Sequence, residues 1–139
     1  MSPTILVLDD DAVIRDLISE VLQDEGFQVV AAESLTEMLK VAPKHADLLI
    51  TDFWINFQAL GLRAVEQVRQ ATRSDLPAIL CTAALKESED RKAEIAQLRA
   101  HLLLKPFTID EFLDMVNRAL KPAIPELPQA AFQVRAAWA

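Results

Sequence analysis

Short apolar runs that each end at polar residues are the feature of this sequence that most limits how the chain can fold. Four such runs are present, and the polar residues that follow them are Asp9-Asp10-Asp11, Asp52, Thr82 and Lys105. Unbroken apolar runs are typical of parallel strands covered on both faces of a sheet. The C-terminal ends of parallel strands share one edge, where open α/β sheets bind ligands. We therefore expect these polar side chains to lie together at one edge of a sheet.

Helical patterns alternate with the predicted strands along the chain. Strands are expected at residues 5–8, 27–32, 48–51, 78–81 and 102–104. Helices are expected at residues 12–25, 34–42, 62–70, 87–99 and 108–120, with capping-box patterns at Ser34 and Thr108. Gly26 follows the first helix, where a left-handed cap is expected. Five successive strand–helix units indicate an α/β fold with a parallel sheet and helices on both faces.

The acidic residues at the predicted edge need a positive partner. At roughly 4 Å and an effective dielectric of about 20, two carboxylates repel each other by about 4 kcal/mol. A hard divalent cation with oxygen ligands is the natural partner for such a cluster. Asp11 is expected to cap the first helix instead, because aspartate favours the N-cap position.

The composition and net charge exclude several classes of protein. With 139 residues, 52% of them hydrophobic, the chain is long enough for one domain. A net charge of −7 argues against a nucleic-acid partner, because phosphate binding needs clustered Lys and Arg. Cys81 is the only cysteine, so no internal disulfide can form. There is no bilayer-length apolar run and no signal-peptide pattern, so we expect a cytoplasmic protein without a membrane partner.

The order of these elements, with an acidic pair, an aspartate, a threonine and a lysine at successive strand ends, resembles the receiver domain of bacterial two-component response regulators. The resemblance covers roughly residues 4–120. It implies a flavodoxin-like, doubly wound sheet of five parallel strands in the order 2-1-3-4-5, with five helices. It also implies a Mg²⁺-dependent phosphoacceptor whose phosphorylation acts as a conformational switch, and whose partner is a sensor histidine kinase or a phosphotransfer protein.

The resemblance also assigns metal ligands. Asp9 and Asp10 match the acidic pair that holds Mg²⁺, with Asp10 the more direct ligand. Asp52 matches the aspartate that accepts the phosphoryl group and also contacts the metal. The backbone carbonyl of Trp54 matches the third protein ligand.

The remaining matches concern the phosphoryl group. Thr82 matches the hydroxyl that donates a hydrogen bond to a phosphoryl oxygen, and Lys105 matches the lysine that pairs with the phosphate. Pro106 matches a proline that family members commonly join through a cis bond. Beyond accepting the phosphoryl group on Asp52 and slowly losing it, no enzymatic activity is expected.

The chain departs from the family pattern in the loop after the acceptor. Receivers usually have proline four residues after the acceptor and glycine eight residues after it, whereas this chain has Asn56 and Leu60, with the glycine one residue later as Gly61. In receivers the residues two after the acceptor and two after the threonine flank the path of the attacking water. Here they are Trp54 and Ala84, which have no acid or base, so we expect a long-lived phosphorylated form.

Two further departures lie around the last strand. Leu102 stands where many receivers carry the Tyr or Phe that swings inward on phosphorylation, so we expect movement of residues 53–60 and 83–89 instead. Arg99 and Ala100 stand in the turn before this strand, where glycine is usual.

Two other functions stay open. The altered acceptor loop allows a pseudo-receiver, a binding module of the same fold that does not take phosphate productively. An enzyme that hydrolyses phosphate esters with Asp52 as nucleophile is disfavoured, because the usual second acid, two residues along, is Trp54 here.

The predicted domain covers residues 1–121, and residues 122–139 form a proline-containing linker or tail. Pro122, Pro125 and Pro128 recur every third residue, as in polyproline II. The tail is expected to be a linker, or else a docking segment that packs Phe132 and Trp138 on a partner or second subunit. A homodimer stays open, as does the choice between a single-domain regulator and part of a longer protein.

Overall fold

The computed structural model describes residues 2–83 and 85–121, and it contains one sheet of five parallel strands. The strands are β1 (Thr4–Leu8), β2 (Gln28–Ala32), β3 (Leu48–Asp52), β4 (Ala78–Thr82) and β5 (His101–Leu104). Their order is β2-β1-β3-β4-β5, and every neighbouring pair is parallel. The predicted flavodoxin-like fold is confirmed.

The helices connect the strands in the predicted places. They are α1 (Ala12–Asp24), α2 (Leu35–Val41), α3 (Gly61–Ala71), α4 (Leu85–Asp90), α5 (Lys92–Gln97) and α6 (Ile109–Leu120). The one helix predicted at 87–99 is divided into α4 and α5, because Arg91 leaves helical geometry at φ −111°, ψ 20°. None of the helices in the described part is long and apolar enough to cross a membrane.

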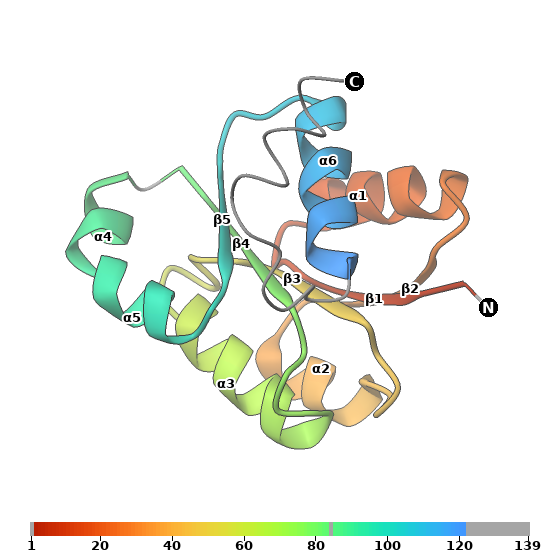
Figure 1. Ribbon diagram of the computed structural model, residues 1–139, viewed down its shortest axis with the longest axis horizontal. Coiled ribbons are helices and arrows are strands. Elements are labelled where there is room, and N and C mark those ends of the chain that lie inside the picture. Colours follow the sequence, from red (N-terminus) through yellow and green to blue (C-terminus); the bar gives the residue numbers. More distant parts are fainter. Residues whose placement is uncertain (1, 84, 122–139) are drawn as a thin grey trace, which may run out of the picture.

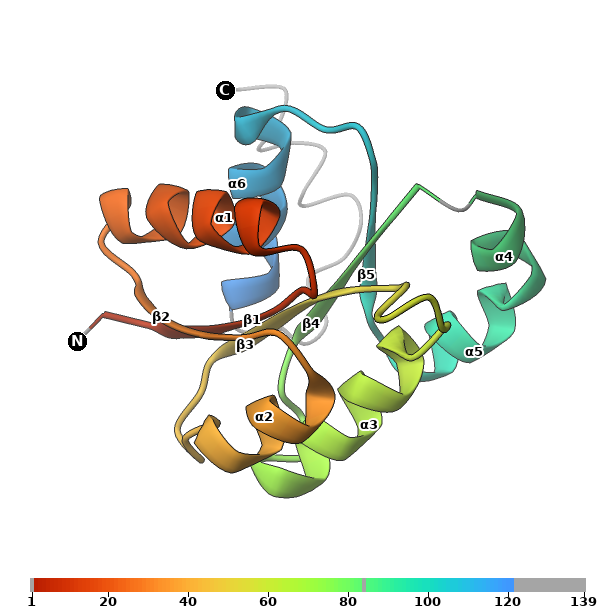
Figure 2. The same cartoon turned by 180° about the vertical axis from the view of Figure 1, so that it is seen from behind.

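The sheet separates two apolar layers. Figures 1 and 2 show α1 and α6 on one face and α2 and α3 on the other. Side chains alternate along each strand, so in β1 Ile5 faces the layer of α1 and α6, whereas Leu6 faces the layer of α2 and α3. Strands buried on both faces explain why the apolar runs in the sequence are unbroken.

Most local signals at the helix ends are confirmed. The capping box predicted at Ser34 is only half formed, because the Ser34 side chain accepts from the Glu37 amide but the Glu37 carboxylate accepts from the amide of Glu33. The Asp11 side chain caps α1 by accepting hydrogen bonds from the amides of Val13 and Ile14. Thr108 and Glu111 form the predicted capping box of α6. Gly26 has a φ of 92°, the left-handed conformation expected after α1.

The Lys105–Pro106 bond is cis, as the resemblance implied. The predictions for Ala84 and for the tail, including Pro122, Phe132 and Trp138, lie outside the described residues.

Candidate functional site

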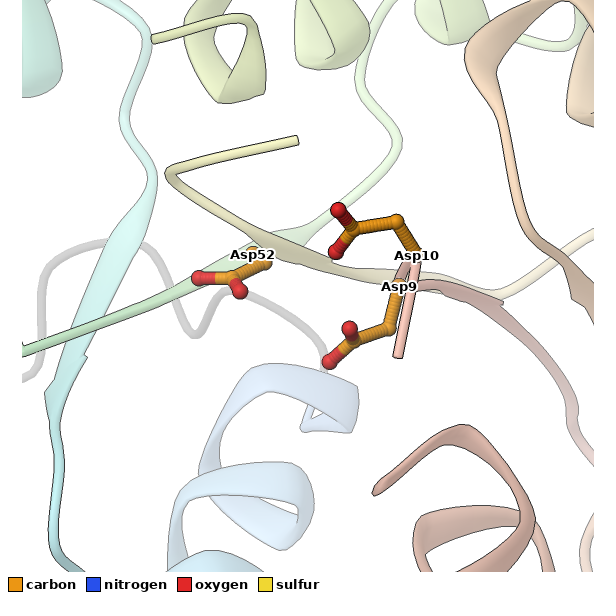
Figure 3. A group of neighbouring side chains, drawn as sticks. All are labelled: Asp9, Asp10 and Asp52. Atoms are coloured by element: carbon orange, nitrogen blue, oxygen red, sulfur yellow. The ribbon is translucent and has the colours of Figure 1, made fainter. Parts of the chain in front are cut away.

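Three aspartates meet at the C-terminal edge of the sheet (Figure 3). Asp9 and Asp10 follow β1, and Asp52 is the last residue of β3. Leu8 pairs with Thr51, so the parallel register brings the residues after them side by side. One carboxylate oxygen from each aspartate lies within 4.8 Å of the other two. The predicted acidic cluster is therefore formed by strand register.

Lys105 brings a positive charge to this cluster. Its ammonium nitrogen lies 3.3 Å from Oδ2 of Asp52, and the two side chains are 29% and 14% exposed. The lysine is held there from β4, because its backbone amide donates to the carbonyl of Thr82 over 2.9 Å. An ion pair this sheltered from water is screened less than a surface pair.

The surroundings favour the neutral form of two of the carboxyl groups. Burial raises the pKa of Asp9 above its ordinary value of 3.8, although the Asp11 amide donates to its Oδ1 over 2.9 Å. Burial also raises the pKa of Asp52, and this effect outweighs the Lys105 charge and the hydrogen bond from the Trp54 amide, which lower it. Holding Asp9 and Asp52 in their ionised forms at these positions therefore costs free energy.

The loop after β3 reaches back to the third aspartate. The backbone amide of Asn56 donates a hydrogen bond of 2.9 Å to Oδ2 of Asp10. Asn56 and Phe57 have positive φ values of 52° and 63°, in a tight turn closed by a bridge between Ile55 and Gln58. Proline, which receivers usually carry at this position, has no N–H and could not make this bond. Sequence reasoning missed the contact, and the only signal for it was asparagine's tolerance of positive φ.

The carboxylates and the lysine line a pocket of about 330 Å³. Trp54 and Phe57 from the loop and Ile14 from α1 line it too. Phe57 is 98% exposed, although it is a large apolar side chain. Thr82 is fully buried at the end of β4, and the described lining of this pocket does not include it.

Gly61 begins α3 directly behind Asp52. A Cβ atom at this position would lie 2.7 Å from the Asp52 carbonyl oxygen and 2.8 Å from the Phe53 Cα. The Gly61 amide also donates to the Phe53 carbonyl over 3.0 Å. The late glycine is therefore required by the close approach of two backbones.

The two departures around β5 have different surroundings. Leu102 is half-buried and packs against the apolar layer of α2 and α3. Arg99 has a positive φ of 54° in the turn between α5 and β5.

Comparisons with known proteins agree on one family. A family model described as the response regulator receiver domain matches residues 5–117. The chain is 30% identical to the regulatory protein VirG of Agrobacterium tumefaciens, over 84% of this chain and 43% of that protein. It is 29% identical to the phosphate regulon transcriptional regulatory protein PhoB of Klebsiella pneumoniae, over 90% of this chain and 55% of that protein. The chain thus spans about half the length of these curated relatives.

Solved structures show the same fold. The chemotaxis protein CheY4 of Vibrio cholerae is 30% identical with a TM-score of 0.76, and the match covers 86% of this chain and all of that one. The HemR receiver domain of Leptospira biflexa has a TM-score of 0.77 at 24% identity, covering 91% of this chain and all of that one.

Proposed function

This chain belongs to the response regulator receiver family, and from this premise we propose that it accepts a phosphoryl group on Asp52 as a switch in a two-component phosphorelay. The observation that carries the proposal is the convergence of Asp9, Asp10 and Asp52 beside the ammonium of Lys105. Asp52 is the natural acceptor because it stands at the end of the central strand, next to the cation.

In the proposed reaction, an oxygen of the Asp52 carboxylate forms a bond to the phosphorus of a phosphohistidine on a partner. The bond from phosphorus to the imidazole nitrogen breaks, and the imidazole keeps that electron pair. The partner is proposed to be a sensor histidine kinase or a phosphotransfer protein. The transition state spreads negative charge over three equatorial oxygens, so the site has mainly to position the groups and neutralise charge.

Lys105 and Thr82 are proposed to bind the transferred group. The Lys105 ammonium, now paired with Asp52, would pair with a phosphoryl oxygen as a point charge. The Thr82 hydroxyl would donate to another phosphoryl oxygen. Since Thr82 is fully buried, that hydrogen bond requires a change around the end of β4.

The oxygen donors of the pocket fit Mg²⁺. One carboxylate oxygen from each of the three aspartates lies within 4.8 Å of the other two, and carboxylate oxygens are the ligands that Mg²⁺ prefers, so the three side chains could converge on one ion. Asp9, Asp10 and Asp52 would hold the ion together with the backbone carbonyl of Trp54. When bound, Mg²⁺ supplies positive charge to the phosphoryl oxygens.

Substitution of the acceptor tests the proposal. The parent protein, incubated with Mg²⁺ and acetyl phosphate, should gain the mass of one phosphoryl group, and Asp52→Asn should gain none. Asp16→Asn, an exposed aspartate on α1, is the matched control and should behave as the parent. A parent that stays unmodified would favour the pseudo-receiver, and an undiminished adduct in Asp52→Asn would contradict the assignment of the acceptor.

We propose a switch rather than a phosphohydrolase. An aspartyl phosphohydrolase commonly has a second acid two residues after its nucleophile, and Trp54 occupies that position beside the pocket. The Trp54 indole is not a base that could accept a proton from an attacking water, so the phosphorylated form should be long-lived. The rate at which the phosphoryl adduct is lost after the donor is removed measures this lifetime. Turnover of p-nitrophenyl phosphate would favour the enzyme instead.

We also propose that residues 1–121 form the domain and that a linker or tail follows them. We propose further that the chain is cytoplasmic and itself contacts neither nucleic acid nor membrane. Homodimer formation stays open. Size-exclusion chromatography with light scattering, before and after phosphorylation, measures it directly.

A further inference from the structure

A second cleft lies at the opposite edge of the sheet from the acidic pocket. Its walls include Pro3, Pro77 and His101, at or just before the first residues of β1, β4 and β5, whereas the acidic pocket lies at the C-terminal strand ends. The ends of α3, α5 and α6 complete it, and its volume is about 1150 Å³. The proposed phosphoacceptor chemistry uses none of its residues.

The cleft has the opposite charge to the rest of the molecule. The whole chain carries 14 Lys and Arg against 21 Asp and Glu. The cleft is lined by five cations, Arg69, Arg73, Arg99, Arg118 and Lys121, and by two carboxylates, Asp47 and Asp75. Positive charge is therefore concentrated here in an acidic protein.

Two of the cations are fixed in the walls. The Arg69 guanidinium donates to the backbone carbonyls of Leu76 and Leu98. Arg73 donates to the carbonyl of Ala46 over 3.2 Å and pairs with Asp75 at 3.7 Å. These carbonyl groups carry no net charge, and the charge of Asp75 acts on Arg69 less strongly than that of Arg99 does.

The other three cations have no carboxylate partner within the described residues. Arg99, Arg118 and Lys121 are exposed, and none of them forms an ion pair in that part of the chain. The cations also act on one another and on His101. The pKa of Arg69 is lowered by burial and by the charge of Arg99, and the pKa of His101 is lowered by burial and by the charge of Arg118.

The turn that carries Arg99 adds an independent observation. The Arg99 amide donates to the Ala96 carbonyl over 3.1 Å, and Arg99 lies in the short connection from α5 to β5. Figure 1 shows this connection. A φ of 54°, as at Arg99, is readily adopted by glycine but is unfavourable for arginine. A left-handed residue is a common end of an α-helix and is usually glycine, so the feature that bears on the cleft is that this position carries arginine and its charge.

We propose that this cleft binds a small anion that carries two or more linked phosphate groups. Guanidinium groups match phosphate oxygens with paired hydrogen bonds, and the cleft is larger than a single phosphate requires. The described lining contains no Phe, Tyr or Trp, and its five cations suit the charge of a phosphate chain. A long nucleic acid is disfavoured because the net charge of −7 repels it outside the cleft.

Isothermal titration of the full chain with inorganic triphosphate, at low ionic strength and without divalent ions, tests the proposal. We expect one saturable site in the parent. Arg99→Gly should lower the affinity about tenfold, because one charge-assisted contact is lost. This variant also relieves the strain at φ 54°, so its thermal unfolding temperature should not fall.

The controls separate this site from general charge effects. Arg99→Lys keeps the charge and should recover most of the affinity. Arg63→Gln removes an exposed arginine of α3 that does not line the cleft, and Asp52→Asn alters the acidic pocket, so both should bind as the parent does.

An ATP titration identifies the source of the phosphates. Equal affinity for ATP and triphosphate supports recognition of the phosphate chain alone, and tighter binding of ATP supports a nucleotide. No binding by the parent, equal loss in Arg63→Gln and Arg99→Gly, or tighter binding of a pentaglutamate peptide than of triphosphate would overturn the proposal.

Discussion

Hydrogen bonds from neighbouring groups hold each of the three pocket carboxylates in place. Asp9 accepts from the Asp11 amide, Asp10 accepts from the Asn56 amide, and Asp52 accepts from Lys105. Hydrogen bonds to a charged group are worth about 1.5–3 kcal/mol each, which offsets part of the mutual repulsion. The arrangement favours a divalent cation because the clustered Asp9, Asp10 and Asp52 face the single ammonium of Lys105 in the described lining of the pocket.

Replacing Asp10 should separate metal binding from folding. Asp10→Asn removes one negative charge from the cluster, so Mg²⁺ affinity should fall at least about tenfold, a loss of about 1.4 kcal/mol. The thermal unfolding temperature without metal should stay the same or rise, because like-charge repulsion is relieved. Calorimetric Mg²⁺ titration measures the first effect, with Asp16→Asn as control. An unchanged Mg²⁺ titration in Asp10→Asn would exclude that residue as a ligand.

At the scale of elements, α3 packs closely against the end of β3, the strand that carries Asp52. The two elements meet at Gly61, where the helix backbone approaches the Asp52 carbonyl. Gly26 differs, because its φ is 92° and no atom lies within 4 Å of an added Cβ. The two glycines are therefore needed for different reasons, one for space and one for conformation.

Alanine substitutions should distinguish these reasons. Gly26→Ala should cost about 1 kcal/mol from backbone strain alone. Gly61→Ala should cost more, about 2–3 kcal/mol, because rigid backbone atoms must move apart. It should also slow phosphorylation of Asp52, whereas Gly26→Ala should not. Urea unfolding and the mass assay check both effects, and equal behaviour of the two variants would contradict the close-approach argument.

The loop from β3 to α3 is also the element expected to respond to phosphorylation. Its turn is tied to the pocket by Asn56, and it exposes Phe57. Leu102 on β5 packs against an apolar layer and has no polar group that could report on the phosphoryl group.

Hydrogen exchange tests whether phosphorylation changes the conformation of residues 53–60 and 83–89. Adding Mg²⁺ with the phosphate mimic beryllofluoride should change amide exchange in residues 53–60 and 83–89. Exchange in β2, at the far side of the sheet, serves as the internal control and should stay constant. Unchanged exchange in both segments of a protein saturated with the mimic would show that these segments do not respond to phosphorylation.

At the scale of the whole molecule, the two edges of the sheet carry opposite charge. Acidic groups gather at the C-terminal strand ends, and cations gather in the cleft at the N-terminal ends. The acidic edge costs folding free energy near neutral pH, because burial raises the pKa of both Asp9 and Asp52.

The stability of the whole domain should therefore depend on pH in a specific direction. Between the ordinary pKa of 3.8 and the raised folded value of Asp52, the folded state binds more protons than the unfolded state, so stability falls as pH rises. The unfolding free energy of Asp52→Asn, relative to the parent, should then increase through that range and become constant above it. Urea unfolding in EDTA from pH 3.5 upward measures this, at roughly half-unit steps. A difference that does not vary with pH would show that the Asp52 pKa is not raised.

The sequence by itself determined the order of elements and the convergence of Asp9, Asp10, Asp52 and Lys105 at one edge of the sheet. Apolar runs marked the buried strands, and a polar residue at each strand end marked one edge, because parallel strands must align their ends. Asp11 and Thr108 fixed their helix starts through caps that involve residues only two or three positions away. Hydrogen bonds over so few residues can be predicted from the local sequence alone.

The tertiary structure decided everything that depends on distance across the chain. The Asn56 amide meets Asp10 across 46 residues, which only the packing of the loop on the edge could establish. The space available at Gly61 depends on where α3 lies against β3. Likewise Arg69, Arg99 and Arg118 come from three separate segments and form one cleft only when α3, α5 and α6 end side by side. A sequence shows the charges of such residues, but their mutual distances exist only in the folded chain.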